Sequence, residues 1–521
     1  MVWVDQICIN QSDLAEKTSQ VQLMSLIYRR AWNTVIWLGD FPADNAFDAL
    51  QELQDNTMNV SGPLPDEEKE RMCSPPYMVP GGFEAIEELF TVPWFQRTWT
   101  IQEAVLSTEL WVMAGTSTRH WEDSIGCAAD NQRLGLFQPT LADKLTTDDV
   151  APVKLHGFHA ANALWSFKQY FNSCRQKYPL IHALVDTRHT QATNPLDNVY
   201  GILGLTRSRV IPDYELDATE LWQNISLQIL KAEPQDYTLD QACRLFCCVD
   251  HDMNDSGNLP SWAVDWSKPR VTTSLGFSTS VTSCFDAGKS STVTSVFQIR
   301  DCERMLCFNA KIFDTIENLS PILEDADLEA AVSGMTNVAL RTCITHATSA
   351  PLNIKTKLSS LGFCKVVTAG KDSSGMQPYP AGYTEILSFL CDAVTGQSPT
   401  FHDQLYTPRQ RKGRLTLENL KTRSSGRLFQ DIRVAFKAAV LNRRLCWTKR
   451  GHLGLVPRFA RRGDCVAVVP GCAVPFVLRR AGERGDGTLL CRFVGEAYVD
   501  GIMHGEALAD DGIELIDLDI V

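Results

Sequence analysis

The first forty residues contain two short apolar runs, one on each side of an amphipathic segment. Residues 2–9 are almost continuously apolar, which is typical of a strand covered on both faces. An Asp13/Glu16 pair then resembles a capping box, and apolar side chains recur at helical spacing up to residue 31. A second apolar run occupies residues 35–38. The pattern predicts a strand–helix–strand unit with parallel strands and a right-handed crossover.

Farther along, the patterning changes from helical to strand-like. Helices are predicted over residues 44–54, 83–90, 164–171, 194–206 and 221–230, and a helix through Glu103 is followed by a predicted strand at 110–114. The Pro- and Gly-rich stretch 61–82 predicts a surface loop or lid. From residue 443 onward, short β-forming runs separated by glycines predict a small barrel or sandwich.

The length of 521 residues suggests about two to four domains. The pattern predicts an α/β domain at 1–125, a helical extension at 150–270, a mixed region at 271–440 and a small β-rich module at 441–521. Within the mixed region, residues 365–428 are polar and predict a mobile linker. The expected fold class is α/β, with a parallel sheet in the first domain.

Charge argues against a nucleic-acid partner. The chain has a net charge of -13 and a pI near 5.3, so it would repel phosphate backbones unless a local basic patch reversed the field. One basic cluster consists of Arg409, Arg411, Lys412 and Arg414. We interpret it as a solvated surface run in preference to a nuclear address.

The sequence predicts an intracellular, cytoplasmic protein with no membrane span. No run of about 18 apolar residues occurs, and the first residues lack the basic region and cleavage site of a secretory signal. The 17 cysteines include no CxxC pair, and no HExxH pattern accompanies them. We therefore expect buried, reduced thiols and no metal site.

The stretch WTIQEAVL at residues 99–106 carries the candidate chemistry. On a helix, Trp99 and Glu103 lie one turn apart on the same face. Two interpretations are open. Glu103 could be a working carboxylate, or it could pair with Arg97 and anchor the packing of Trp94 and Trp99. The polar residues that end the first predicted strand are further candidates, because ligands of parallel sheets bind beyond the carboxyl ends of the strands.

Several sequence blocks resemble one known family. The blocks VWVDQICINQSDLAEKTSQVQLMSLIYRRAWNTVIWLGD and PWFQRTWTIQEAVL are similar to the fungal heterokaryon incompatibility (HET) domain. Family members continue with blocks that are matched here by NPLDNVYGILGL, WAVDW and GEAYVDGIMHGE, in the same order. The first of these departs from the usual D-P-R-D-K, with Asn194, Leu196 and Asn198 at the changed positions.

The resemblance implies a role in non-self recognition and programmed cell death. HET domains are considered distantly similar to TIR domains, which have a flavodoxin-like α/β fold and include NAD-cleaving enzymes. Trp99 and Glu103 fit the W-x-x-x-E pattern that carries the working glutamate in such enzymes. The resemblance therefore implies Glu103 as the catalytic residue of an NAD glycohydrolase. Trp99 is then expected to bind the substrate NAD, with Asp5, Asn10 and Gln11, at the end of the first predicted strand, as further substrate-binding residues and no resident cofactor.

Other readings of the same resemblance remain open. HET domains usually begin with a further strand and loop, so the resemblance implies a first domain shortened at its amino terminus, with its first strand missing. A non-catalytic signalling module that associates with itself or with another protein of the HET pathway is the alternative to an enzyme. An inactive, truncated family member is a third possibility. The absence of a G-x-S-x-G sequence disfavours a serine hydrolase.

Overall fold

The computed structural model resolves two compact units. The first comprises residues Met1–Leu221 with Trp266–Pro269, and the second comprises Trp222–Asp265 with Arg270–Val521. The structure describes residues 2–57, 71–72, 77–126, 153–174, 178–231, 239–250, 257–277, 283–289, 297–301, 303–324, 338–349, 360–395 and 423–521. The predicted loop at 61–82 therefore lies mostly outside the described residues, and the basic cluster at 409–414 lies entirely outside them.

The first unit contains a three-stranded sheet in the order β1 (Thr34–Trp37), β2 (Leu110–Ala114), β3 (Ser117–His120). β1 and β2 are parallel, and β2 and β3 are antiparallel. Alternation along the strands gives the sheet two different faces. Ile36 and Val112 are buried register partners on one face, whereas Val35, Trp37 and Trp111 are exposed on the other.

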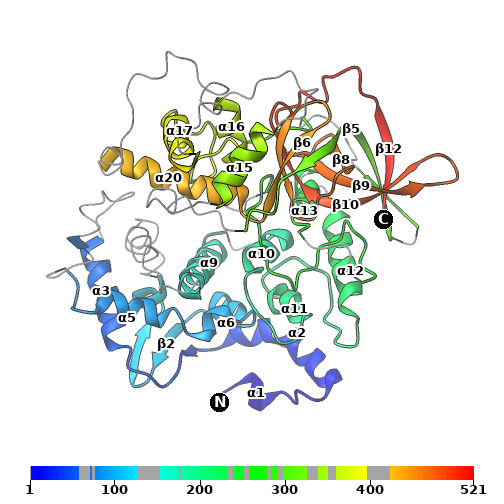
Figure 1. The fold of residues 1–521 in the computed structure, drawn as a ribbon. Coiled ribbons are helices and arrows are strands. Elements are labelled where there is room, and N and C mark those ends of the chain that lie inside the picture. Colours follow the sequence, from blue (N-terminus) through cyan, green and yellow to red (C-terminus); the bar gives the residue numbers. More distant parts are fainter. Residues whose placement is uncertain are drawn as a thin grey trace. The chain divides into compact units, whose positions relative to one another are not determined.

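Helices make up most of the first unit and confirm the helical patterning of the sequence (Figure 1). They are α2 (Leu14–Arg30), α3 (Asp44–Thr57), α5 (Gly82–Leu89), α6 (Thr100–Leu106), α9 (Val153–Cys174), α10 (Leu180–Thr187) and α11 (Asp197–Leu203), with the single turns η1 (Pro93–Gln96) and η2 (Glu122–Gly126). Asp13 begins α2, because its side chain accepts hydrogen bonds from the backbone N–H groups of Ala15 and Glu16.

The predicted strand at residues 2–9 is wrong. Asp5–Cys8 forms one helical turn, α1, and Val2, Val4 and Ile7 are exposed. No described strand pairs with this segment, so its apolar run does not enter a sheet and local hydrogen bonding determines its conformation. The Asp5 side chain, for example, accepts a hydrogen bond from the backbone N–H of Gln6 at 2.8 Å. The parallel pair of this unit is therefore β1–β2, and not a pair within residues 2–40.

The second unit is built on a nine-stranded sheet that closes on itself. Its strands are β4 (Phe297–Arg300), β5 (Met305–Leu319), β6 (Arg443–Thr448), β7 (Leu453–Pro457), β8 (Cys465–Val468), β9 (Phe476–Glu483), β10 (Leu489–Glu496), β11 (Tyr498–Val499) and β12 (Leu515–Ile520). β8 pairs with both β9 and β5, so the ring β5-β12-β10-β9-β8 is a barrel without a free edge. The predicted β runs after residue 443 are confirmed, and β4, β5 and β12 add to them.

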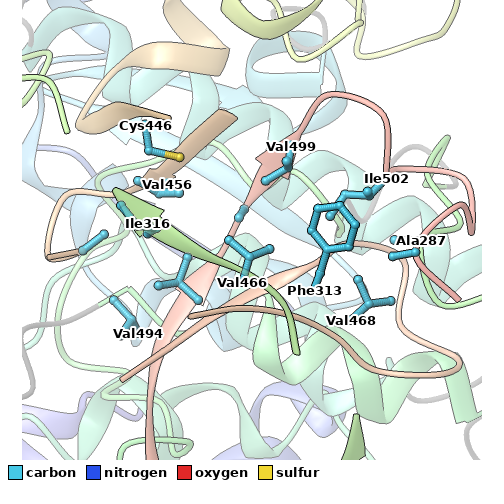
Figure 2. Packing of buried hydrophobic residues seen from close by; sticks show 14 residues of the cluster. Ala287, Phe313, Ile316, Cys446, Val456, Val466, Val468, Val494, Val499 and Ile502 are labelled. Atoms are coloured by element: carbon cyan, nitrogen blue, oxygen red, sulfur yellow. The ribbon is translucent and has the colours of Figure 1, made fainter. Parts of the chain in front are cut away.

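Alternating side chains of these strands fill the core of the second unit. Figure 2 shows Phe313 and Ile316 of β5 packed with Val466 and Val468 of β8. Val466 is the register partner of Val477 on β9, and all of these valines are buried. Residues i and i+2 of a strand point to the same face, so apolar residues such as Val466 and Val468 line the core together.

Further helices belong to the second unit or lead into it. They are α12 (Ala218–Leu230), α13 (Leu239–Phe246), α15 (Val338–Thr348), α16 (Ser360–Val367), α17 (Gly382–Thr395) and α20 (Arg423–Val440). α17 lies inside the stretch 365–428 that was predicted to be a polar linker, and it buries Tyr383, Ile386 and Leu390. The prediction is wrong over this helix, because its apolar side chains recur at helical spacing within a segment of polar average composition.

The whole chain is thus a mixed α/β protein with a small amino-terminal sheet, helices in the middle and a large carboxy-terminal sheet. The flavodoxin-like or TIR-like sheet is not confirmed, since the described residues of the first unit contain a single parallel strand pair. In the part of the chain that the structure describes, no helix combines the length and apolarity that a membrane crossing requires.

Candidate functional site

A cavity of about 970 Å³ lies in the first unit. Its wall comes from α1 and the turn after it, from one face of α2, from the segment before α6 and from residues 191–197. Three of the five candidate residues, Asp5, Gln11 and Trp99, line it. The structure therefore brings Asp5 and Gln11 together with Trp99, which lies about ninety positions later in the sequence.

Glu103 is not among the residues that line the cavity, and it lies one helical turn after Trp99. Trp99 is the N-cap of α6 and Glu103 belongs to its first turn, so the predicted spacing of the indole and the carboxylate is present. Burial raises the pKa of Glu103 to about 7, and the negative charge of Asp5 contributes to the rise. The guanidinium of Arg97 and hydrogen bonds from Trp94 and Tyr28 act in the opposite direction.

Lys168 fixes the other end of α6. Its ammonium group is buried and donates hydrogen bonds to the carbonyl oxygens of Ala104, at 3.0 Å, and Ser107, at 2.7 Å. Burial lowers the pKa of Lys168. A cation at the last carbonyl groups complements the helix dipole, so a side chain from α9 holds the short helix that carries Glu103.

The remaining candidate residues differ in their surroundings. Gln11 donates a hydrogen bond to the backbone carbonyl of Asp5 at 3.2 Å, which ties the turn after α1 to the start of that helix. Asn10 is not among the lining residues. Its side-chain oxygen accepts hydrogen bonds from the backbone N–H and the hydroxyl of Ser12, at 3.2 and 2.7 Å. Asn10 therefore shapes the turn between α1 and α2.

Sequence reasoning missed the wall that residues 191–197 provide. The backbone N–H of Thr98 donates to the carbonyl of Gln191 at 3.1 Å, and the Thr98 and Thr190 hydroxyls lie 2.9 Å apart. Buried Gln102 donates to the carbonyls of Tyr200 and Gly201 at 3.3 and 2.8 Å. The signal was the block NPLDNVYGILGL, from which we predicted a helix and a family resemblance but no part of the site.

The described residues offer no group of three histidine, cysteine or acidic side chains that could hold a metal ion. Eleven of the thirteen described cysteines are buried, and Cys8 and Cys284 are more accessible. What the cavity offers instead is a set of carboxylates, amides, an indole and two cationic side chains, Lys17 and Arg97. Such a set can bind an organic ligand that carries both hydroxyl groups and charge.

Comparisons with known proteins match two separate parts of the chain. Residues 1–103 match the family model described as "Heterokaryon incompatibility protein (HET)", and residues 397–513 match the model described as "Het-6 beta-barrel domain". The chain is 24% identical to "Heterokaryon incompatibility protein 6, OR allele" of Neurospora crassa, over 98% of this chain and 81% of that protein. No solved structure matches.

Proposed function

We propose that the chain is a fungal heterokaryon incompatibility protein and that it acts in non-self recognition and cell death by cleaving NAD in the cavity of its first unit. The observation that carries the proposal is the position of Glu103. A carboxylate with a pKa of about 7 lies one helical turn from a cavity-lining indole, in electrostatic contact with two cavity-lining residues, Asp5 and Arg97.

The proposed reaction is hydrolysis of the bond between nicotinamide and ribose. The C–N bond breaks, its electron pair neutralises the pyridinium ring, and the ribose carbon passes through an oxocarbenium-like state. Ionised Glu103 stabilises that positive charge. Water then adds to the same carbon, and a carboxylate whose pKa is near neutrality is suited to accept the proton that the water loses. The products are ADP-ribose, nicotinamide and a proton.

The other lining residues have matching roles in this proposal. Trp99 stacks on the flat nicotinamide ring, and Asp5 and Gln11 exchange hydrogen bonds with ribose hydroxyls. Asn10 orders the turn that presents Asp5 and Gln11, and so acts as a positioning residue.

The test is nicotinamide release from NAD by the purified full-length chain. Glu103→Gln keeps the size of the side chain and removes its charge, so we expect turnover to disappear. Glu88→Gln is the matched control, because Glu88 is exposed on α5 and does not line the cavity. A folded protein that releases no nicotinamide at high concentration would refute NAD cleavage.

A second candidate function is signalling by self-association without catalysis. The observation that favours it is the exposed face of the small sheet, where Val35 and Trp111 are register partners and Trp37 lies beside them. Contiguous exposed aromatic and aliphatic side chains often mark interaction surfaces. In this case Trp37→Glu would abolish oligomers seen by light scattering and would abolish cell death, whereas Glu103→Gln would leave both unchanged.

A further inference from the structure

Among the described residues, two cationic side chains of the cavity form no close ion pair, although Arg97 attracts Glu103 at longer range. Arg97 follows η1 and Lys17 lies on α2, and both line the cavity. No described carboxylate lies within 4.0 Å of either cationic group, although many other described arginines form ion pairs. The Lys17 ammonium lies over the ring of Tyr214, 4.0 Å from its centroid.

The carboxylates of the same cavity are already engaged as acceptors. Asp197 accepts a hydrogen bond from the hydroxyl of Tyr214 at 2.6 Å, and Asp5 accepts one from the backbone N–H of Gln6 at 2.8 Å. Tyr214 therefore contacts both the cation of Lys17 and the carboxylate of Asp197. The cavity is therefore lined both by cationic groups, on Lys17 and Arg97, and by carboxylates, on Asp5 and Asp197.

A ligand that matches this wall carries anionic oxygens together with hydroxyl groups. Arg97 presents a planar set of donors that suits a phosphate, and Lys17 presents a second positive charge. Asp5 and Asp197 retain lone pairs that accept hydrogen bonds from sugar hydroxyls. Nucleotides combine these features in one molecule, whereas free nucleosides lack the anionic part.

We propose that the cavity binds a nucleotide whose phosphate groups are held by Arg97 and Lys17, with the second wall supplied by residues 191–197. This proposal rests on the proposed function, because cleavage of NAD makes NAD the expected nucleotide. It extends that function by assigning the phosphate contacts and by placing part of the binding site outside the 1–103 stretch that matches the HET family model.

The test is calorimetric binding of ADP-ribose to the full-length chain, a probe that needs no turnover. We expect Lys17→Met and Arg97→Gln each to weaken binding by roughly tenfold to a hundredfold, the usual effect of losing a hydrogen bond to a charged group. Arg30→Gln is the matched control, because Arg30 is exposed on the same helix as Lys17 and does not line the cavity. Adenosine should bind much more weakly than ADP-ribose.

A second measurement uses only the unmodified chain, and so it tests the proposal even if the variants fail to fold. With the unmodified chain, inorganic pyrophosphate should compete with ADP-ribose, and added salt should weaken the binding because the attraction is between charges. ADP-ribose binding that is absent, insensitive to both substitutions, or no tighter than adenosine binding would overturn the proposal. ADP-ribose binding that depends on Arg97 and Lys17 in a protein that does not cleave NAD would support it while refuting the proposed function.

Discussion

Glu103 occupies a site that opposes its own ionisation. Burial and the neighbouring charge of Asp5 raise the pKa of its carboxyl group to about 7, against the combined effect of Arg97, Trp94 and Tyr28. A residue that served only to pair with Arg97 would have its pKa lowered. Perturbed carboxylates beside a cavity are characteristic of functional sites, and this one would exchange protons close to neutral pH.

The raised pKa has a consequence for stability that needs no knowledge of the substrate. In the unfolded chain, Glu103 has an ordinary pKa near 4.5, so between about pH 4.5 and 7 the folded state holds more protons and stability falls as pH rises. Glu103→Gln removes the buried charge. We therefore expect the variant to melt at a higher temperature than the unmodified chain at pH 8, and the difference to shrink near pH 5.

Calorimetric melting of both proteins at the two pH values measures this effect. A variant that is less stable at pH 8 than the unmodified chain would mean that the ionised carboxylate is better solvated in the folded state than in water. That result would contradict the assignment of desolvation as the main cause.

At the scale of elements, the short helix α6 depends on its neighbours. Gln102 donates to two carbonyls of α11, and Gly204 at the end of α11 lies against Gln102. A Cβ at Gly204 would lie 2.3 Å from the side-chain oxygen of Gln102 and 2.6 Å from the Cβ of Ser25. Glycine is required here for close approach, which the block NPLDNVYGILGL does not reveal by itself.

We expect Gly204→Ala to destabilise the first unit by about 1–3 kcal/mol, the usual cost of overpacking. It should also lower nicotinamide release, because α6 carries Glu103. Gly485→Ala is the control, since a Cβ there meets nothing within 4 Å, and its effect should stay within about 0.5 kcal/mol. Equal unfolding midpoints in urea for the two variants would contradict the close contact between α6 and α11.

Sequence periodicity predicted the elements whose burial follows their own pattern. α2, α3, α5 and β1 are found close to their expected positions, because each has an apolar stripe or run bounded by a cap or turn. Residues 2–9 have the same apolar signal, but no strand pairs with them in the described structure. An apolar run forms a buried strand only when another strand pairs with it. The local sequence does not show whether such a strand exists.

The candidate site was recovered in part for a related reason. The helical spacing of Trp99 and Glu103 is local and could be predicted. Asp5 lines the cavity although its predicted strand is a helix, and Gln11 lines it from the turn after that helix. The wall at residues 191–197 depends on contacts between segments about ninety residues apart, such as Thr98 with Gln191. Local patterning contains no information on such contacts.

At the scale of the whole molecule, the second unit is held together by a buried ionic cluster. Glu496 is 4% exposed and accepts hydrogen bonds from Arg270 at 2.8 Å, Arg443 at 3.2 Å and the backbone N–H groups of Leu275 and Gly276. The cluster joins the last residue of β10 to the first residue of β6 and to the segment 270–276. Glu496 lies more than fifty residues from both arginines in the sequence. The block GEAYVDGIMHGE could therefore be recognised as a family block, but the ion pairs of its glutamate could not be predicted.

Removing the charge of Glu496 leaves the guanidinium groups of Arg270 and Arg443 without their anionic partner, although backbone carbonyls still accept hydrogen bonds from both. We expect Glu496→Gln to destabilise the second unit by about 3–5 kcal/mol, the usual cost of breaking a buried ion pair. Tryptophan fluorescence in urea reports the transition. Glu483→Gln, at an exposed position of β9, should behave like the unmodified chain. A Glu496→Gln protein with an unchanged transition would show that the cluster does not hold the barrel.

The most direct test of Glu103 as the catalytic residue is nicotinamide release from NAD, measured from about pH 5.5 to 8.5 for the full-length chain and for Glu103→Gln. We expect the unmodified chain to turn NAD over, with a rate that rises with pH through about 7 as Glu103 ionises. We expect Glu103→Gln to have no activity at any pH. Turnover that persists in Glu103→Gln, or its absence from the folded unmodified chain, would contradict the assignment of Glu103 as the catalytic residue.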